Sequence, residues 1–105
     1  MSKASSDLVK ELRIAIRTGQ VVIGSRRTVK MVLLGKAKLV VIASNAPPEL
    51  REDIYRYAKL SNIKVIEAPL TNTELGAAIG KPFSVASLAI IDPGESNILN
   101  VYVEG

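Results

Sequence analysis

Asn45 is the first residue whose type and position suggest chemistry. It follows the apolar run 39–43 and lies in the segment 44–48, which reads Ser-Asn-Ala-Pro-Pro. A continuous apolar run of this length is typical of a strand buried on both faces of a sheet. The carboxyl end of such a strand in an α/β sheet borders the crevice where ligands bind. The Asn amide has donors and an acceptor that suit the edge of a nucleobase. The alternative is that Asn45 closes an Asx-turn before the two prolines.

A second candidate is the segment Gly24-Ser25-Arg26-Arg27, where a predicted strand gives way to a helix. Glycine lets the main chain come close to a ligand, and the start of a helix presents free amides to an anion. The two arginines add forked donors for phosphate or guanine. Neither a dinucleotide-binding fingerprint nor a phosphate-binding loop has this spacing. The alternative is an ordinary turn with exposed arginines.

Phe83 is the single Phe of the chain, and it follows Lys81 and Pro82 in a predicted loop. A lone aromatic residue more often fills a core than binds a ligand. An exposed aromatic ring beside a cation, however, is the usual arrangement for holding an unstacked base. We therefore expect Phe83 either to fill the core or to stack on a base, and its place in a loop favours stacking.

The chain contains neither Cys nor His. Disulfides and thiol catalysis are therefore excluded, and the commonest general base and metal ligand are missing. The carboxylates Glu49, Glu52 and Asp53 cluster at the start of a predicted helix, where negative charge stabilises the helix dipole. Most hydrolytic chemistry therefore loses its usual residues, and we expect no cofactor and no metal site.

The charge of the chain is uneven along its length. Residues 1–45 carry nine basic and two acidic residues, a net charge of +7, whereas residues 46–105 carry five and eight, a net charge of −3. A polyanion should meet the N-terminal half first, through a phosphate attraction that depends on salt. The alternative is that these cations form a solvated helix face.

The composition predicts one domain, residues 1–105, with an aliphatic core, because 48% of the residues are apolar and only 4% are aromatic. No apolar run is long enough to cross a bilayer and no secretory signal is evident, so we expect a cytoplasmic protein without a membrane partner.

Periodicity and end signals predict four helices, four strands and an element of unassigned type after Ser96. The helices with their caps are 6–19, 24–35, 48–62 and 71–80, and the strands are 21–23, 39–43, 64–66 and 86–91. The first helix would be capped by Ser6 or Asp7. This order predicts a three-layer α/β/α sandwich around a four-stranded, largely parallel sheet.

Five segments together resemble a known family. They are GSRRTVK at 24–30, KLVVIASN at 38–45, YAKLS at 57–61, NTELG at 72–76 and DPGES at 92–96. They are similar to the archaeal L-thirty-e family of large-subunit ribosomal proteins, which belongs to the small α/β/α proteins that bind kink-turn RNA. The resemblance runs from about residue 8 to 99. It implies an α/β/α sandwich, a structural role in the large ribosomal subunit, and no catalysis. The implied partners are large-subunit rRNA and neighbouring ribosomal proteins, with a monomer when free.

The family grips RNA with three loops at one end of the sandwich. Carried over by position, the resemblance implies main-chain approach at Gly24 and Ser25, phosphate or guanine contact at Arg26 beside Arg27, base contact at Asn45, and packing against bases by Phe83 and Val85. Sister proteins carry an Asn-Glu pair that reads tandem sheared G·A pairs, where this chain has Arg26-Arg27. Direct readout of those pairs by this segment is therefore not expected. The alternatives are a small α/β nucleotide-binding domain or enzyme that uses the same crevice, and a purely protein-binding scaffold.

Overall fold

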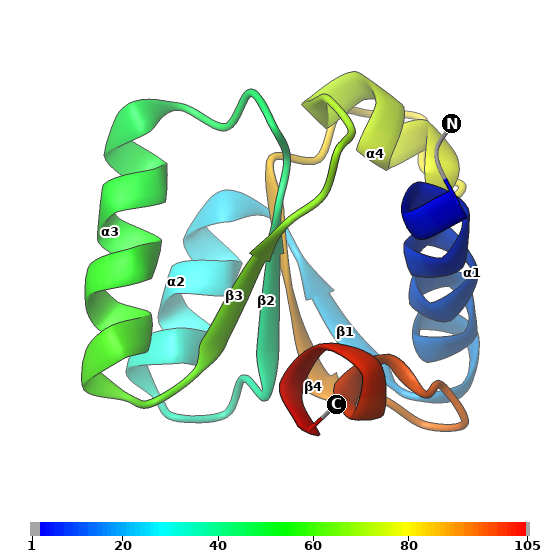
Figure 1. The fold of residues 1–105 in the computed structure, drawn as a ribbon. Helices are drawn as coiled ribbons and strands as arrows, with labels where there is room; N and C mark the ends of the chain where they lie inside the picture. Colours follow the sequence, from blue (N-terminus) through cyan, green and yellow to red (C-terminus); the bar gives the residue numbers. More distant parts are fainter. Residues whose placement is uncertain (1–2, 105) are drawn as a thin grey trace.

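The computed structural model describes residues 3–104 as helices packed on both faces of a four-stranded sheet (Figure 1). In chain order the elements are α1 (Lys3–Thr18), β1 (Gln20–Ile23), α2 (Ser25–Leu33), β2 (Leu39–Ile42), α3 (Pro48–Leu60), β3 (Lys64–Glu67), α4 (Asn72–Ala78), β4 (Ser87–Asp92) and η1 (Asn100–Glu104). The predicted sandwich is confirmed. Helix α1 starts earlier than predicted, so Ser6 and Asp7 lie inside it and not at its start. The final element, which the sequence left unassigned, is a short π-helical turn.

The prediction of a largely parallel sheet is wrong. The strand order is β1-β4-β2-β3, and β4 runs antiparallel to both of its neighbours, whereas β2 and β3 are parallel. A parallel crossover requires a helix that runs back along the sheet. Helix α4 has only seven residues and lies across one end of the sheet instead (Figure 1). The chain therefore enters β4 from the end at which it left β3, and β4 must run in the opposite direction.

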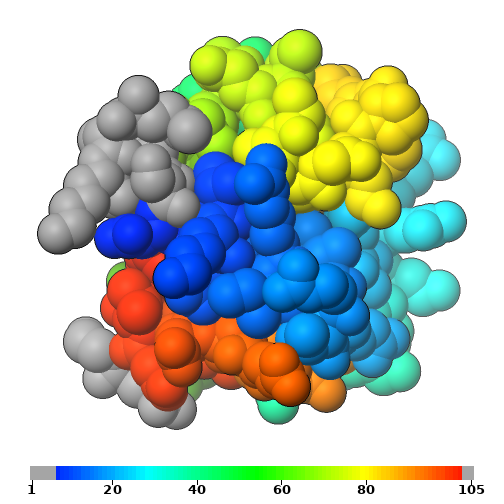
Figure 2. All heavy atoms as spheres, turned by 90° about the vertical axis from the view of Figure 1, so that its right-hand side faces the viewer, coloured from blue at the N-terminus to red at the C-terminus, as the bar shows by residue number. Residues whose placement is uncertain are grey.

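The apolar residues form one cluster on each face of the sheet. Helices α1 and α4 cover one face together with the C-terminal segment, and α2 and α3 cover the other. All four residues of β2 are fully buried, as the continuous apolar run predicted. Figure 2 shows the side of the molecule that α1 covers, with α1 between the α4 region above and the segment after β4 below. Within residues 3–104, no helix combines the length and the apolar content that crossing a membrane requires.

Candidate nucleic-acid interface

The reversed direction of β4 gathers three connections at one end of the sandwich. They are the helix-opening turn (residues 24–27), the diproline loop (43–48) and the Phe83 loop (79–86). The Gly24 N–H donates to the Ser87 carbonyl oxygen at 3.0 Å, and the Ala43 N–H donates to the Ala86 carbonyl oxygen at 2.8 Å. The end of the Phe83 loop is thus bonded to both of the others. The structure brings together the three segments that the sequence singled out.

Asn45 forms a reciprocal pair with Asn72 of α4. The Asn72 main-chain N–H donates to Asn45 Oδ1 at 2.8 Å, and Asn45 Nδ2 donates to Asn72 Oδ1 at 3.1 Å. The alternative of an Asx-turn at Asn45 is not formed, because Pro47 and Pro48 have no N–H to offer the Asn45 side chain. The Asn72 N–H also fixes which way the Asn45 amide points, since it must face the oxygen. One Nδ2–H and one Oδ1 lone pair of the exposed Asn45 side chain remain free for a ligand.

Asn72 is the residue that the sequence analysis missed. Its carbonyl oxygen accepts the Val85 N–H at 2.9 Å, so the same residue holds the diproline loop and the Phe83 loop. Its position at the start of α4 is fixed by a capping box formed by Thr71 and Glu74. Thr71 Oγ1 accepts the Glu74 N–H at 3.3 Å, and the Glu74 carboxylate accepts the Thr71 N–H at 2.9 Å. These hydrogen bonds lower the pKa of the Glu74 carboxyl below its usual value.

Arg51 holds the other side of the diproline loop. Its guanidinium donates to the Ser44 carbonyl oxygen at 3.1 Å and forms an ion pair with Glu67 at the end of β3. Arg51 therefore ties the residue before Asn45 to the neighbouring strand. The forked guanidinium allows both contacts at once. No sequence spacing pointed to this pair, because the partners come from different elements.

Phe83 and Val85 have opposite environments. The Phe83 side chain is 56% exposed, so it is not a core residue. Val85 is 2% exposed and belongs to the core cluster beneath α1 and α4. The prediction that the Val85 side chain packs against bases is wrong in this conformation. Val85 instead anchors the loop that presents Phe83, by its buried side chain and by its N–H bond to Asn72.

Gly24 sets the geometry of the helix-opening turn. Its φ of 117° and ψ of 151° lie in a region that essentially only glycine adopts. No side chain caps α2 or α3 at the start, so their first amides stay available to an anion. Arg26 and Arg27 are exposed in the first turn of α2. This arrangement suits a phosphate held by main-chain amides and arginines.

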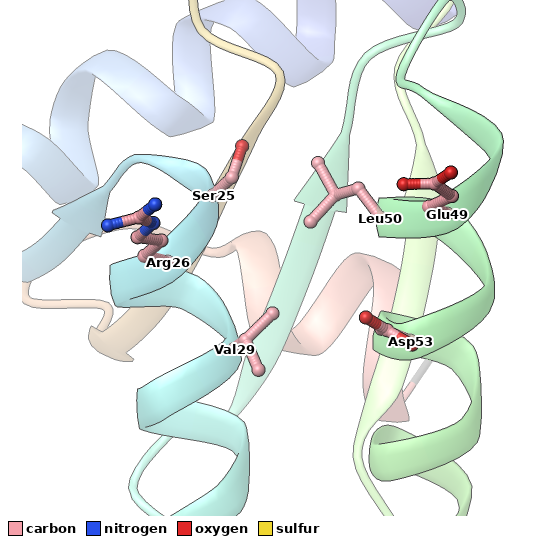
Figure 3. Close-up of a pocket in the computed structure, with 6 residues that line it drawn as sticks. All are labelled: Ser25, Arg26, Val29, Glu49, Leu50 and Asp53. Carbon is pink, nitrogen blue, oxygen red and sulfur yellow. The ribbon is translucent and has the colours of Figure 1, made fainter.

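A shallow pocket of about 380 Å³ lies between the first turns of α2 and α3 (Figure 3). Its lining combines apolar and charged side chains. The lining residues are Ser25, Arg26, Val29, Glu49, Leu50 and Asp53. In Figure 3 the Arg26 guanidinium points away from Glu49 and Asp53. Among the residues described, no three His, Cys, Asp or Glu side chains are grouped to hold a metal ion.

The Asn45–Asn72 pair leads to a testable expectation for a double-mutant cycle. Asn45→Ala should weaken binding of a kinked internal-loop RNA by about 1–3 kcal/mol and leave duplex RNA almost unaffected. If Asn72 acts by positioning Asn45, Asn72→Ala should add little once Asn45 is gone. Thr73→Ala, at the exposed neighbouring position, is the matched control and should bind normally. Thermal melts of all variants separate a lost contact from a lost fold. Additive losses would mean that Asn72 acts independently of Asn45.

Comparison with known proteins places the whole fold in one family. Residues 6–100 match the model of the ribosomal protein L7Ae/L30e/S12e/Gadd45 family. A protein of Methanocaldococcus jannaschii named large ribosomal subunit protein eL30 is 50% identical over 99 residues, which cover 94% of this chain and 90% of the relative. Proteins of the same name from Methanothermobacter thermautotrophicus and Sulfurisphaera tokodaii are 52% and 48% identical. Those matches cover 90% of this chain and 97% and 90% of the relatives, respectively.

Proposed function

The chain belongs to the ribosomal protein L7Ae/L30e/S12e/Gadd45 family, and from this premise we propose that it is a structural protein of the large ribosomal subunit. It binds rRNA, has neighbouring ribosomal proteins as partners, acts in the cytoplasmic ribosome and catalyses no reaction. The observation that carries this assignment is the similarity to archaeal proteins of that name over nine-tenths of both chains. A matching length means that the whole domain, and not one motif, is shared.

We further propose that the RNA element is a kinked internal loop of the kink-turn type. Single-stranded loops and bulges are the parts of RNA whose bases can be splayed out and read. The three loops offer one kind of contact each. Gly24, Ser25 and the two arginines contact phosphate, Asn45 contacts the edge of a base, and Phe83 stacks on a base. The loops project from one end of the sandwich, so one compact RNA feature reaches all three.

Internal bonding holds the three loops before the RNA arrives. Asn72 bonds the diproline loop and the Phe83 loop, and Arg51 bonds the diproline loop to β3. Preorganised groups lose little conformational entropy on binding, so more of the contact energy appears as affinity. The remaining hydrogen-bonding capacity of the Asn45 amide is therefore presented in one fixed orientation.

Replacing Phe83 tests the stacking role. Because the side chain is more than half exposed, Phe83→Ala should change the free energy of unfolding by less than about 1 kcal/mol. It should remove about 1–3 kcal/mol of affinity for the internal-loop RNA, the range for stacking of a base on an aromatic ring. Urea denaturation and RNA titration of one preparation measure both. A large drop in the unfolding midpoint, or unchanged affinity, would rule out a stacking platform.

A nucleotide-binding or enzymatic role would have to use the pocket between α2 and α3. Its lining includes Arg26 and two carboxylates, but nothing in it forms a phosphate-binding loop. The relatives carry a ribosomal protein name. We therefore do not propose this second function.

A further inference from the structure

Three leucines at the C-terminal ends of α2 and α3 are exposed. Leu33 is 59%, Leu34 is 54% and Leu60 is 80% exposed. These helix ends lie at the opposite end of the sandwich from the three loops (Figure 1). Single exposed leucines are common on protein surfaces, whereas several together mark an interaction surface.

The helix ends that carry the three leucines meet in space. Ser61 Oγ donates to the Val32 carbonyl oxygen at 3.3 Å, which joins the residue after Leu60 to the residue before Leu33. Helical periodicity gives the same result. Val29 and Asp53 line opposite sides of the groove between α2 and α3 (Figure 3). Leu33 lies one turn beyond Val29, and Leu60 lies two turns beyond Asp53. We call Leu33, Leu34 and Leu60 the leucine patch, and it continues the two sides of this groove.

Cations surround the leucine patch. Lys30, Lys36 and Lys59 are exposed, and none of them forms an ion pair within the part of the chain that the structure describes. No acidic residue occurs between Glu11 and Glu49 in the sequence, so α2 and the segment after it carry positive charge alone. An apolar centre with a positive rim is complementary to an apolar surface flanked by carboxylates.

We propose that the leucine patch is the docking surface for an acidic, amphipathic segment of a neighbouring protein. Apolar side chains of that segment cover the three leucines, and its Asp and Glu side chains face Lys30, Lys36 and Lys59. RNA fits this surface less well, because leucine side chains provide neither a ring for stacking nor a hydrogen bond to a base. The patch and the three loops are at opposite ends of the molecule, so a protein and an RNA bind at the same time. This surface is separate from the RNA-binding function proposed above.

Photo-crosslinking in assembled large subunits tests the occupant. The full chain carrying Leu60→p-benzoylphenylalanine is incorporated into the particle, irradiated and analysed by mass spectrometry. The expected product is a crosslink to a peptide that contains both apolar residues and several Asp or Glu residues. The matched control places the same probe at Phe83, where the crosslink should go to rRNA. A failure of the control alone would count against the proposed RNA site and leave the protein-docking proposal standing.

Charge reversal tests the role of the rim. Lys36→Glu combined with Lys59→Glu should reduce the yield of the protein crosslink from position 60 about tenfold, because two attractions become repulsions. Lys10→Glu on α1, on the opposite face of the sheet, should leave the yield unchanged. All of these positions are exposed, and the unfolding midpoint of each variant verifies that it folds. A crosslink to rRNA or to a basic peptide, no crosslink, or a yield insensitive to charge reversal would overturn the proposal.

Discussion

Gly76→Ala is expected to lower the free energy of unfolding by about 1–3 kcal/mol, although alanine is the better helix former. Gly76 is buried in α4 and faces the Phe83 loop. A Cβ atom at this position would overlap the Phe83 carbonyl oxygen and lie 3.1 Å from the Phe83 carbonyl carbon and 3.3 Å from the Ser84 Cα atom. All three are main-chain atoms, so no side-chain rotation relieves the overlap. Either α4 or the Phe83 loop must move.

The same substitution should weaken RNA binding, because a displaced loop no longer presents Phe83. Ala77→Gly is the matched control. Ala77 is exposed on the same helix, so this change should cost up to about 1 kcal/mol of stability by helix propensity and leave RNA affinity intact. Urea denaturation and RNA titration of the two variants give the comparison. If Gly76→Ala stabilises the protein, α4 does not pack against the loop as closely as the structure has it.

The second large effect is the dependence of RNA affinity on salt. Arg26, Arg27 and Lys81 belong to the three loops. If these three cations meet phosphates, the affinity should fall roughly 20- to 40-fold between about 50 and 200 mM salt. The net charge of residues 1–45 is larger, at +7. Part of that charge is engaged elsewhere, since Arg13 Nε donates to the Ala78 carbonyl oxygen at 2.6 Å.

Paired substitutions locate the salt effect. The double substitution Arg26→Ala with Arg27→Ala should make the log–log slope of affinity against salt less steep, by the amount that about two phosphate contacts contribute. Lys36→Ala with Lys38→Ala removes the same charge at the far end of the sheet and should leave the slope unchanged. The slope is measured by titrating one internal-loop RNA at several salt concentrations. A slope that responds equally to both pairs would mean that the attraction is not directed to the three loops.

The elements were predictable from sequence because their signals are local. Continuous burial of β2, the capping box at Thr71 and the glycines after the helices depend on neighbouring residues. The direction of β4 was not predictable in this way. It depends on whether α4 runs along the sheet or across its end, and seven helical residues do not decide that from their sequence. That single reversal brings the Phe83 loop to the other two loops.

The site residues show the same difference between local signals and contacts that join distant elements. Gly24 and the exposed Phe83 carried signals of their own, whereas Asn72 and Arg51 act through partners in other elements. The sequence also carried evidence against the Asx-turn alternative, because Pro47 and Pro48 leave no N–H for such a turn at Asn45. It carried evidence against base contact by Val85 as well. Val85 is a β-branched residue next to the start of a buried strand, a position that favours the core.

The central claim is that the three loops together recognise a kinked RNA internal loop. The most direct test is a competition titration of the wild-type protein against two RNAs of equal length and composition, one with a kink-forming internal loop and one fully paired. We expect the internal-loop RNA to bind at least about a hundredfold more tightly at one fixed salt concentration, because base contacts at Asn45 and Phe83 add to the shared phosphate attraction. Equal affinity for the two RNAs would contradict it.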